Sequence, residues 1–355
     1  MIRFFFVASL FLLIFGCNSS FYTVTASLET DAVQSADDAA DDPAIFVHPS
    51  NPDLHAMIGT DKQRGLVVFD TKGKIKHDYP FGSINNVDLR QNFPFNGSNI
   101  TLVGGSNRSN NTIVLYSYQA ETFELEPIPC DTIRSLTDEV YGFCFAASSN
   151  AIYAFVVGKN GVVEQWGITE QNNRLHAELV RSIDIGEQCE GMVADDELGF
   201  LYVAEETKGI WKLPIDPTNK TIVPELIADL KTNRALKADL EGLAIYYAPQ
   251  GNGYLIASSQ GNYSYAVFER SVPHTYLGSF KVKAGVVDGS EETDGLDVTH
   301  LPFGAACPNG CLVVQDGKNK DSNNQLENQN FKFIAWEQIA KVFQPNLLGS
   351  KPVEK

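Results

Sequence analysis

The segments "LYVAEETKGIWKLPI" (201–215) and "YLIASSQGNYSYAVFER" (254–270) share one rhythm. In each, an apolar run ends in small residues, a turn follows, and an aromatic run comes next. Short β-branched and aromatic runs bounded by Gly, Asn and Asp are typical of strands joined by tight turns. The two segments therefore predict hairpins of an all-β protein.

The same pattern recurs along the chain, for example in "AIFVH", "GLVVFD", "NTIVLYSY", "AIYAFVVG" and "CLVVQDG". Helical periodicity is predicted only near "LTDEVYG" (136–142) and "FIAWEQIAKVF" (333–343). At about 50 residues per unit, the roughly 320 residues of the mature chain make about six units, near the spacing of propeller blades. We predict an all-β, six-bladed β-propeller, whose closed ring leaves only short edges. A β-sandwich or a β-helix is the alternative.

Composition narrows the class of partner. The 355 residues include 27 Lys and Arg against 44 Asp and Glu, which gives a net charge of −17. We expect no nucleic-acid partner, because the nucleic-acid backbone is itself negative. Cations, or anions that arrive with cations, are the expected ligands. No segment indicates an oligomer interface, so we expect a monomer.

The first 17 residues, "MIRFFFVASLFLLIFGC", have the form of an export signal. A basic residue precedes an apolar run that is too short to span a bilayer comfortably. Gly16-Cys17 resembles the end of a bacterial lipoprotein signal, although Phe15 is bulkier than the residue usual there. We expect an outer-membrane or cell-surface lipoprotein whose only membrane contact is a lipid on Cys17. Ordinary cleavage would instead give a periplasmic or secreted protein.

After that signal we predict a tether at 18–28, a single domain at 29–345 and a C-terminal tail at 346–355. Five cysteines remain besides Cys17, and export permits disulfides. "CPNGC" (307–311) is the best candidate, because its Pro-Asn-Gly turn brings the two ends together. The odd number leaves at least one thiol free or paired outside the chain, and no CxxC pair indicates zinc.

Acidic residues recur at the ends of the strand units, in "DDAADDP" (37–43), "NNVD" (85–88), "DEVYG" (138–142), "EQCEG" (187–191), "AEE" (204–206), "DLEG" (239–242) and "DGSEETDGLD" (288–297). Several read as an acid, then Gly, then an apolar strand. In a propeller this order would place the acids at one end of the central channel. Turn preference explains any single acid. Their recurrence favours Ca²⁺, which accepts about six to eight oxygen ligands in flexible geometry.

Basic residues lie in three polar loops: Lys62 in "GTDKQRG", Arg108 in "GGSNRSNN" and Lys159 in "VGKNG". Surface solubility explains each one alone, but beside metal-bound carboxylates they could hold phosphate oxygens. Other catalytic signatures are missing from the sequence: Arg-His-Gly, a cysteine with arginine six residues later, a Walker A loop, a GxSxG elbow and HExxH. The six histidines are scattered and are more simply explained as structural.

A set of dispersed motifs, in order from about residue 29 to 343, resembles the β-propeller phytases, the alkaline calcium-dependent phytases of bacteria. The motifs are "DDPAIFVHPSNPDLHAMIGTDKQRGLVVFD", "NNVDLR", "SNRS", "DEVYGF", "EQCEGMVADDELGFLYVAEETKGIWK", "DLEGLAIYY", "YLIASSQGNYSYAVFER", "ETDGLDV" and "NQNFKFIAWEQIA". The resemblance implies a six-bladed propeller with several Ca²⁺ ions. It also implies stepwise release of phosphate from calcium-bound phytate (myo-inositol hexakisphosphate) by a calcium-bridged water. One phosphate would occupy a cleavage site and its neighbour an affinity site.

Carried over by motif, the resemblance implies active-site calcium ligands at Glu29, Asp41, Tyr141, Glu190, Glu206, Asp239, Glu241 and Asp294. It places Lys62 and Arg108 on the phosphate being cleaved and Lys159 on the neighbouring one, with Gln260 as a further polar contact. Tyr141 and Glu190 then join Lys62 and Arg108 as the catalytic residues.

Two structural calcium sites are also implied, one at Asp42 with backbone carbonyls near Pro43 and Val87, the other at Asp288 with the loop "QDGKNKD" (315–321). Arg64 and Lys318 depart from the family pattern, and the charge of Lys318 weakens the case for the second site.

Two alternatives to a phosphatase stay open. A propeller lactonase or esterase with one calcium ion needs fewer acids and no set of phosphate-holding cations. A non-catalytic propeller would present a calcium-stabilised surface to a carbohydrate or a protein. The presence of Lys62, Arg108, Tyr141 and Lys159 beside the acids favours the phosphatase.

Overall fold

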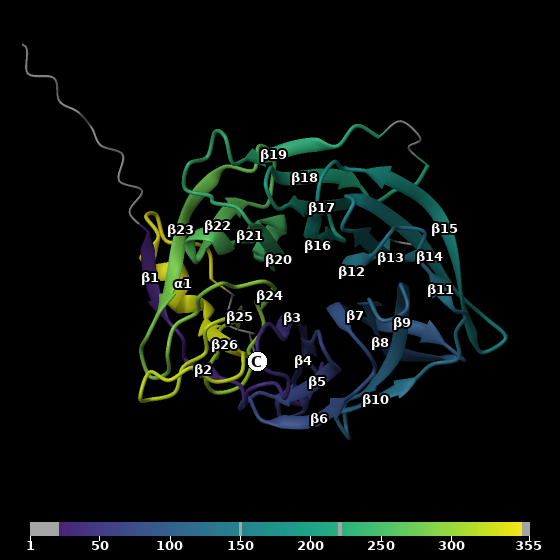
Figure 1. Ribbon diagram of the computed structural model, residues 1–355, viewed down its shortest axis with the longest axis horizontal. Helices are drawn as coiled ribbons and strands as arrows, with labels where there is room; N and C mark the ends of the chain where they lie inside the picture. Colours follow the sequence, from purple (N-terminus) through teal and green to yellow (C-terminus); the bar gives the residue numbers. More distant parts are fainter. Residues whose placement is uncertain (1–20, 149–150, 219–221, 350–355) are drawn as a thin grey trace, which may run out of the picture.

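The computed structural model describes residues 21–148, 151–218 and 222–349 and arranges them as six sheets around a ring (Figure 1). Each sheet is one blade, and the chain is a six-bladed β-propeller, as the hairpin rhythm predicted. The innermost strands, which surround the axis of the ring in Figure 1, are β3, β7, β12, β16, β20 and β24. The export signal and Cys17 lie outside the described residues, so lipidation stays a prediction.

Blades 1 to 3 follow one another along the chain, each running from the axis outward. Blade 1 comprises β3 (Ala40–Phe46), β4 (Ala56–Asp61), β5 (Gly65–Asp70) and β6 (Ile75–Tyr79). Blade 2 comprises β7 (Ile84–Phe95), β8 (Ser98–Asn107), β9 (Thr112–Gln119) and β10 (Glu124–Pro127), with β11 (Ile133–Arg134) also paired to β9. Blade 3 comprises β12 (Val140–Ser148), β13 (Ala151–Gly158), β14 (Val162–Gln171) and β15 (Arg174–Asp184).

Blades 4 to 6 complete the ring. Blade 4 comprises β16 (Cys189–Asp195), β17 (Phe200–Glu205), β18 (Gly209–Pro214) and β19 (Glu225–Asp229). Blade 5 comprises β20 (Leu240–Tyr247), β21 (Gly253–Ser259), β22 (Ser264–Glu269), β23 (Tyr276–Lys283) and, parallel to β23, β1 (Tyr22–Thr25). Blade 6 comprises β24 (Leu296–Thr299), β25 (Cys311–Asp316), β26 (Asn330–Ala335) and β2 (Leu28–Glu29). Short 3₁₀ turns span Pro52–Leu54, Pro249–Gly251 and Gln260–Asn262.

Blade 6 closes the ring by joining the two ends of the chain. Its outer strand β2 pairs antiparallel with β26, with Leu28 opposite Phe333. Residues 22–29, most of which the sequence analysis placed in a tether, therefore belong to the sheets. Leu347 and Leu348 of the predicted tail also pack on the domain, because the Trp336 indole donates to the Leu348 carbonyl at 2.9 Å and Leu347 is buried.

The core lies between the blades rather than in the channel. Buried apolar clusters each span neighbouring blades, and one joins Ile58 and Val68 of blade 1 to Val87 and Val103 of blade 2. In another cluster the Tyr246 ring stacks on Trp336 at a centroid distance of 3.7 Å. The blades are therefore held side by side by flat apolar faces, which leaves polar strand ends and loops around the axis.

The structure confirms most of the other predictions of secondary structure and contradicts one. The two hairpins that opened the analysis are β17–β18 and β21–β22, with Glu205 opposite Gly209 and Ser259 opposite Ser264. The helix at 333–343 is confirmed as α1 (Trp336–Val342). The helix at 136–142 is wrong: a bend leads into β12, whose pairing with β13 outweighs a local pattern of only seven residues.

The disulfide between Cys307 and Cys311 is present, and Cys130, Cys144 and Cys189 are free. Within the described parts of the chain, no helix is long and apolar enough to cross a membrane.

Candidate active site

A repeated β-bulge aims one side chain from each blade at the same end of the channel. In β3, β7, β12, β16 and β20 the register with the neighbouring strand shifts two residues into the strand, and β24 begins just after the equivalent position. Bulges commonly redirect a side chain beside a functional site. We call the residues at this position the bulge ring: Asp41, Asn85, Tyr141, Glu190, Glu241 and Asp294.

Glycines after four bulge-ring residues explain the order of acid, Gly and strand in the sequence. A Cβ on Gly191 would overlap the backbone carbonyl of Glu241, and one on Gly142 would overlap that of Glu190. Gly242 and Gly295 make the corresponding close approaches to the next blade, and the Gly242 amide donates to the Asp294 carbonyl at 2.9 Å. Glycine is therefore needed for the bulges of adjacent blades to touch, which brings their carboxylates together.

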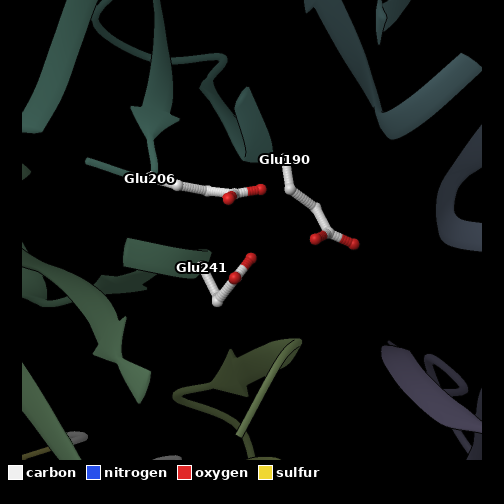
Figure 2. A group of neighbouring side chains, drawn as sticks. All are labelled: Glu190, Glu206 and Glu241. Carbon is white, nitrogen blue, oxygen red and sulfur yellow. The ribbon is translucent and has the colours of Figure 1, made fainter. Parts of the chain in front are cut away.

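Three glutamates form the centre of the acidic group (Figure 2). Glu190, Glu206 and Glu241 each offer a carboxylate oxygen within 4.8 Å of the other two, and all three residues are buried. Glu206 enters from the β17–β18 turn, whereas the other two belong to the bulge ring. Like charges this close cannot all stay ionised unless a cation lies among them.

Burial and neighbouring carboxylates raise the pKa values of several acids in this group. Burial, with the Glu190 and Asp239 charges, raises the pKa of Glu206 to about 7. Burial and the Glu190 carboxylate raise the pKa of Asp41 and of Glu241 well above their usual range. Asp41 Oδ1 and Glu241 Oε2 are buried without a hydrogen-bond partner. These unpartnered oxygens are acceptors suited to a hard cation such as Ca²⁺.

Lys62 lies at the blade 1 side of the acids. Its ammonium is 2.8 Å from Asp38, 3.2 Å from Asp41 and 3.0 Å from Asp294. Burial lowers the pKa of Lys62, but the Asp41 and Asp294 carboxylates outweigh that effect and raise it above its ordinary value. The side chain is therefore a permanent positive charge beside the acids.

Arg108 and Lys159 lie together on the next two blades. The Arg108 guanidinium donates to Glu139 Oε1 at 2.6 Å, and the Lys159 ammonium is 3.2 Å from the same oxygen. Both cations also face the ring of Tyr141, at 5.8 Å and 5.0 Å from its centroid. Arg108 and Lys159 therefore share Glu139 and the Tyr141 ring as partners.

Asn85 and Glu139 are site residues that sequence reasoning missed. The Asn85 amide donates to Glu190 Oε1 at 2.6 Å and to Asp41 Oδ2 at 3.3 Å, and its carbonyl oxygen accepts from Arg108 at 3.2 Å. It therefore links the carboxylates to the cations. The signal that would have found it is its place in "NNVD", which aligns with the other bulge positions.

A cavity of about 710 Å³ opens over the three glutamates and Lys62, and its lining does not include Asp41, Arg108 or Lys159. Its lining includes the predicted residues Lys62, Tyr141, Glu190, Glu206, Asp239, Glu241, Gln260 and Asp294. The Gln260 amide donates to Asp294 at 2.6 Å. We call this the mouth cavity, and it gathers most of the residues that the sequence analysis assigned to an active site.

Glu29 and Asp288, in contrast, lie together in a separate cluster around Lys332. The Lys332 ammonium is fully buried, 2.5 Å from Glu29 and 3.3 Å from Asp316, and it also contacts Asp288. Glu29 is therefore placed with the second predicted structural site and not with the acids of the mouth. Three carboxylates around one ammonium leave a net negative charge.

Asp42 faces a second cavity of about 420 Å³, whose lining includes Pro43, Val87 and Asp88. Its carboxylate accepts from the Val87 amide at 3.1 Å. The predicted trio of Asp42, Pro43 and Val87 therefore shares one wall. Arg64, which departs from the family pattern, pairs with Asp78 at 3.1 Å.

Comparison with known proteins assigns the family. A family model described as Phytase matches residues 14–353. The chain belongs to the phytase family. It is therefore a phytate-hydrolysing enzyme, as the resemblance led us to expect. It is 46% identical over 328 residues to a protein of Bacillus subtilis (strain 168) named 3-phytase, covering 90% of this chain and 85% of that protein.

Among solved structures, the β-propeller domain of Cps50 (Swd1) from Myceliophteria thermophila has a TM-score of 0.44 with this chain, at 11% identity over 82% of each chain.

Proposed function

We propose that this phytase is a calcium-dependent phosphomonoesterase that removes phosphates stepwise from phytate at the mouth cavity. The observation that carries the calcium dependence is the pair of buried, unpartnered oxygens of Asp41 and Glu241 among like-charged neighbours. All the acidic donors are oxygens, which fits Ca²⁺ and does not select zinc. Asp41, Glu190, Glu206, Asp239, Glu241, Asp294 and the Tyr141 phenol would hold the ions.

When bound, Ca²⁺ would supply an activated water for in-line attack and neutralise charge on the transferring oxygens. The chain's own contribution is to bind and orient the phosphate. Lys62 keeps its positive charge beside the acids and would hold an oxygen of the phosphate being cleaved. Arg108, oriented through Asn85, offers a planar set of donors for the same phosphate.

Lys159 would hold the neighbouring phosphate. Because Lys159 and Arg108 share Glu139 and the face of Tyr141, phosphates on adjacent carbons of one inositol ring could reach both. Two linked contacts position the scissile ester better than one, which favours polyphosphorylated substrates. The same carboxylates repel bare phytate, so the substrate would bind together with calcium.

The residues also fit two further calcium positions. One is at Asp42 in the second cavity, and the other is at Glu29, Asp288 and Asp316, where a divalent ion would offset the charge left by Lys332. Both positions are part of the proposal.

Phosphate release from phytate near neutral pH, with millimolar Ca²⁺ and then with a chelator, tests this function. We expect release only with calcium, and we expect Glu190→Gln to lower it by about a hundredfold or more, as for loss of a group that stabilises the transition state. Glu187→Gln is the matched control, because this exposed acid of the same segment does not line the mouth cavity.

Full release in chelator, or with Glu190→Gln, would contradict the proposal. Hydrolysis of a lactone without phosphate release would support the lactonase instead. A folded, calcium-loaded protein that hydrolyses neither would support the binding propeller.

A further inference from the structure

A second set of equivalent positions lies in the turns between the second and third strands of the blades. In blades 1 to 5 one backbone amide of the turn donates to the carbonyl just before the inner strand, and in blade 6 the Gly317 amide donates to the Glu291 carbonyl. Lys62 N donates to Ala39 O at 2.7 Å, and Lys159 N donates to Glu139 O at 3.1 Å. We call the donors the hairpin ring, taken from blades 1 to 6: Lys62, Arg108, Lys159, Glu206, Gln260 and Gly317.

The hairpin ring is chemically uneven. Blades 1, 2 and 3 place cations there, whereas blades 4 and 5 place Glu206 and Gln260. Blade 6 places Gly317, which has no side chain, and the next residue is Lys318. Because blade 6 adjoins blade 1 in the closed ring, a cation from this turn would extend the row of cations on the other side of Lys62.

Lys318 lines the mouth cavity. In the order of the blades around the ring, Lys318 lies on one side of Lys62, and Arg108 and Lys159 lie on the other. Its ammonium is 2.7 Å from Glu292, and the lysine side chain is 41% exposed, so solvent and ligands can reach it. Among the described lining residues of the cavity, Lys62 and Lys318 are the basic ones. Lys62 already contacts three carboxylates, whereas Lys318 contacts one.

The backbone under Lys318 is fixed by hydrogen bonds. The Lys318 amide donates to Asp316 Oδ1 at 3.1 Å, and the Gly317 amide donates to Glu291 O at 2.9 Å. The base of the side chain is therefore held at the rim, and its tip can exchange Glu292 for another anion. Glu292 would keep a partner, because the Tyr263 hydroxyl donates to it at 3.4 Å.

We propose that Lys318 forms a third phosphate-binding position, on the blade 6 side of the cleavage site, which binds a distal phosphate of a polyphosphorylated substrate. This inference rests on the proposed function, since it names a further part of the same site. A phosphate dianion carries more charge than the Glu292 carboxylate and would displace it from the ammonium. The position selects substrates with several phosphates, because a monophosphate in the cleavage site has no group to reach it.

The test compares Lys318→Ala, Lys318→Arg and Lys320→Ala with the unaltered calcium-loaded enzyme. Lys320 belongs to the same loop and pairs with Glu291, but it does not line the mouth cavity. Both alanine variants remove one charge from one loop, so any difference between them reports local contact and not overall charge. The readouts are kcat and KM for phytate and for p-nitrophenyl phosphate, and the Kd of myo-inositol hexakissulfate by calorimetry.

We expect Lys318→Ala to raise both the KM for phytate and the Kd of the hexakissulfate by about three- to fivefold, the size of an exposed ion pair. We expect no change in kcat or in the values for p-nitrophenyl phosphate. Lys318→Arg should restore the binding, and Lys320→Ala should leave it unaltered.

Equal values for Lys318→Ala and the unaltered enzyme, or equal losses in the two alanine variants, would overturn the third position. The proposed function fails separately, through absence of calcium-dependent phosphate release by the unaltered enzyme. Hexakissulfate binding tests Lys318 even then.

Discussion

At the mouth of the channel, Asp41 Oδ1 and Glu241 Oε2 are buried without a hydrogen-bond partner, whereas Asp88, which lines the second cavity, has several partners. There, Asp88 accepts from the Leu89 and Phe145 amides at 2.6 Å and 2.8 Å and pairs with Arg90 at 2.8 Å. Arg90 also pairs with Asp196 at 3.0 Å. The inner strands thus carry acids of both kinds.

The two sets of carboxylates differ in whether their oxygens have hydrogen-bond donors, and not in their charge. Burial raises the pKa of Asp88, but its oxygens accept from two amides and pair with an arginine, so this carboxylate has donors for its charge and supports the fold. A carboxylate that faces other carboxylates and lacks donors destabilises the fold until a cation arrives. Asp41 and Glu241 at the mouth are therefore suited to a metal ion, whereas Asp88 and Arg90 already satisfy one another and contribute to stability.

We expect the largest effect from the loss of one mouth acid, which tests this comparison most directly. Glu241→Gln keeps the shape of the side chain and removes one negative charge next to Glu190. We expect phosphate release to fall by about a hundredfold or more, because calcium and the transition state lose a ligand. In chelator the variant should melt above the unaltered protein, because a repulsion is gone. A variant that melts lower in chelator would show that Glu241 supports the fold as Asp88 does.

The second prediction tests the hydrogen-bond and ion-pair network of Asp88. Asp88→Ala leaves Arg90 with one fewer partner and removes the acceptor of two backbone amides. We expect the free energy of unfolding to fall by about 1–3 kcal/mol, mainly because two backbone donors lose their acceptor. Denaturant titration measures this loss. Release of phosphate per folded molecule should not change, and a hundredfold loss of it would place Asp88 in the site.

The smallest effect concerns pH. Without calcium, the folded protein holds protons on Glu206 at a pKa of about 7 and on Asp294 at about 6, where burial is the first cause for both. An unfolded chain holds them less tightly, since its carboxyls titrate near pH 4. Folding is therefore favoured by these groups at low pH, and the contribution is lost as pH rises through the folded values. In chelator we expect the melting temperature to fall by about 2–4 °C between about pH 5 and pH 8.

Calcium should abolish that fall, because it stabilises the ionised carboxylates that pH 8 produces. The control is the same pair of melting curves with saturating calcium. An identical fall with calcium present would mean that the mouth acids do not bind it.

The sequence could predict whatever follows from a local repeat. The blades, the convergence of Asp41, Glu190, Glu241 and Asp294, and the loop cations are each encoded by neighbouring residues. Asn85 was missed because it is not acidic, so the search for acids in "NNVD" did not include it, although the register of β7 places it at the bulge position.

Glu29 was misplaced among the mouth acids for a different reason. Its position depends on β2 pairing with β26, some 300 residues later in the chain. No spacing near residue 29 carries that information. Glu139 was likewise quoted in "DEVYG" without a role, because its contacts with Arg108 and Lys159 come from two neighbouring blades.

The closure of blade 6 also sets the order in which the molecule can be completed. The strand that finishes the ring, β2, is made near the start of synthesis, and its partner β26 near the end. Between those moments the N-terminal strand has no edge to join, so the last blade assembles only after almost the whole chain has appeared. Removing Leu28 and Glu29 would leave β26 as an open edge, a template for aggregation. Leu28 and Glu29 are thus synthesised early and paired last.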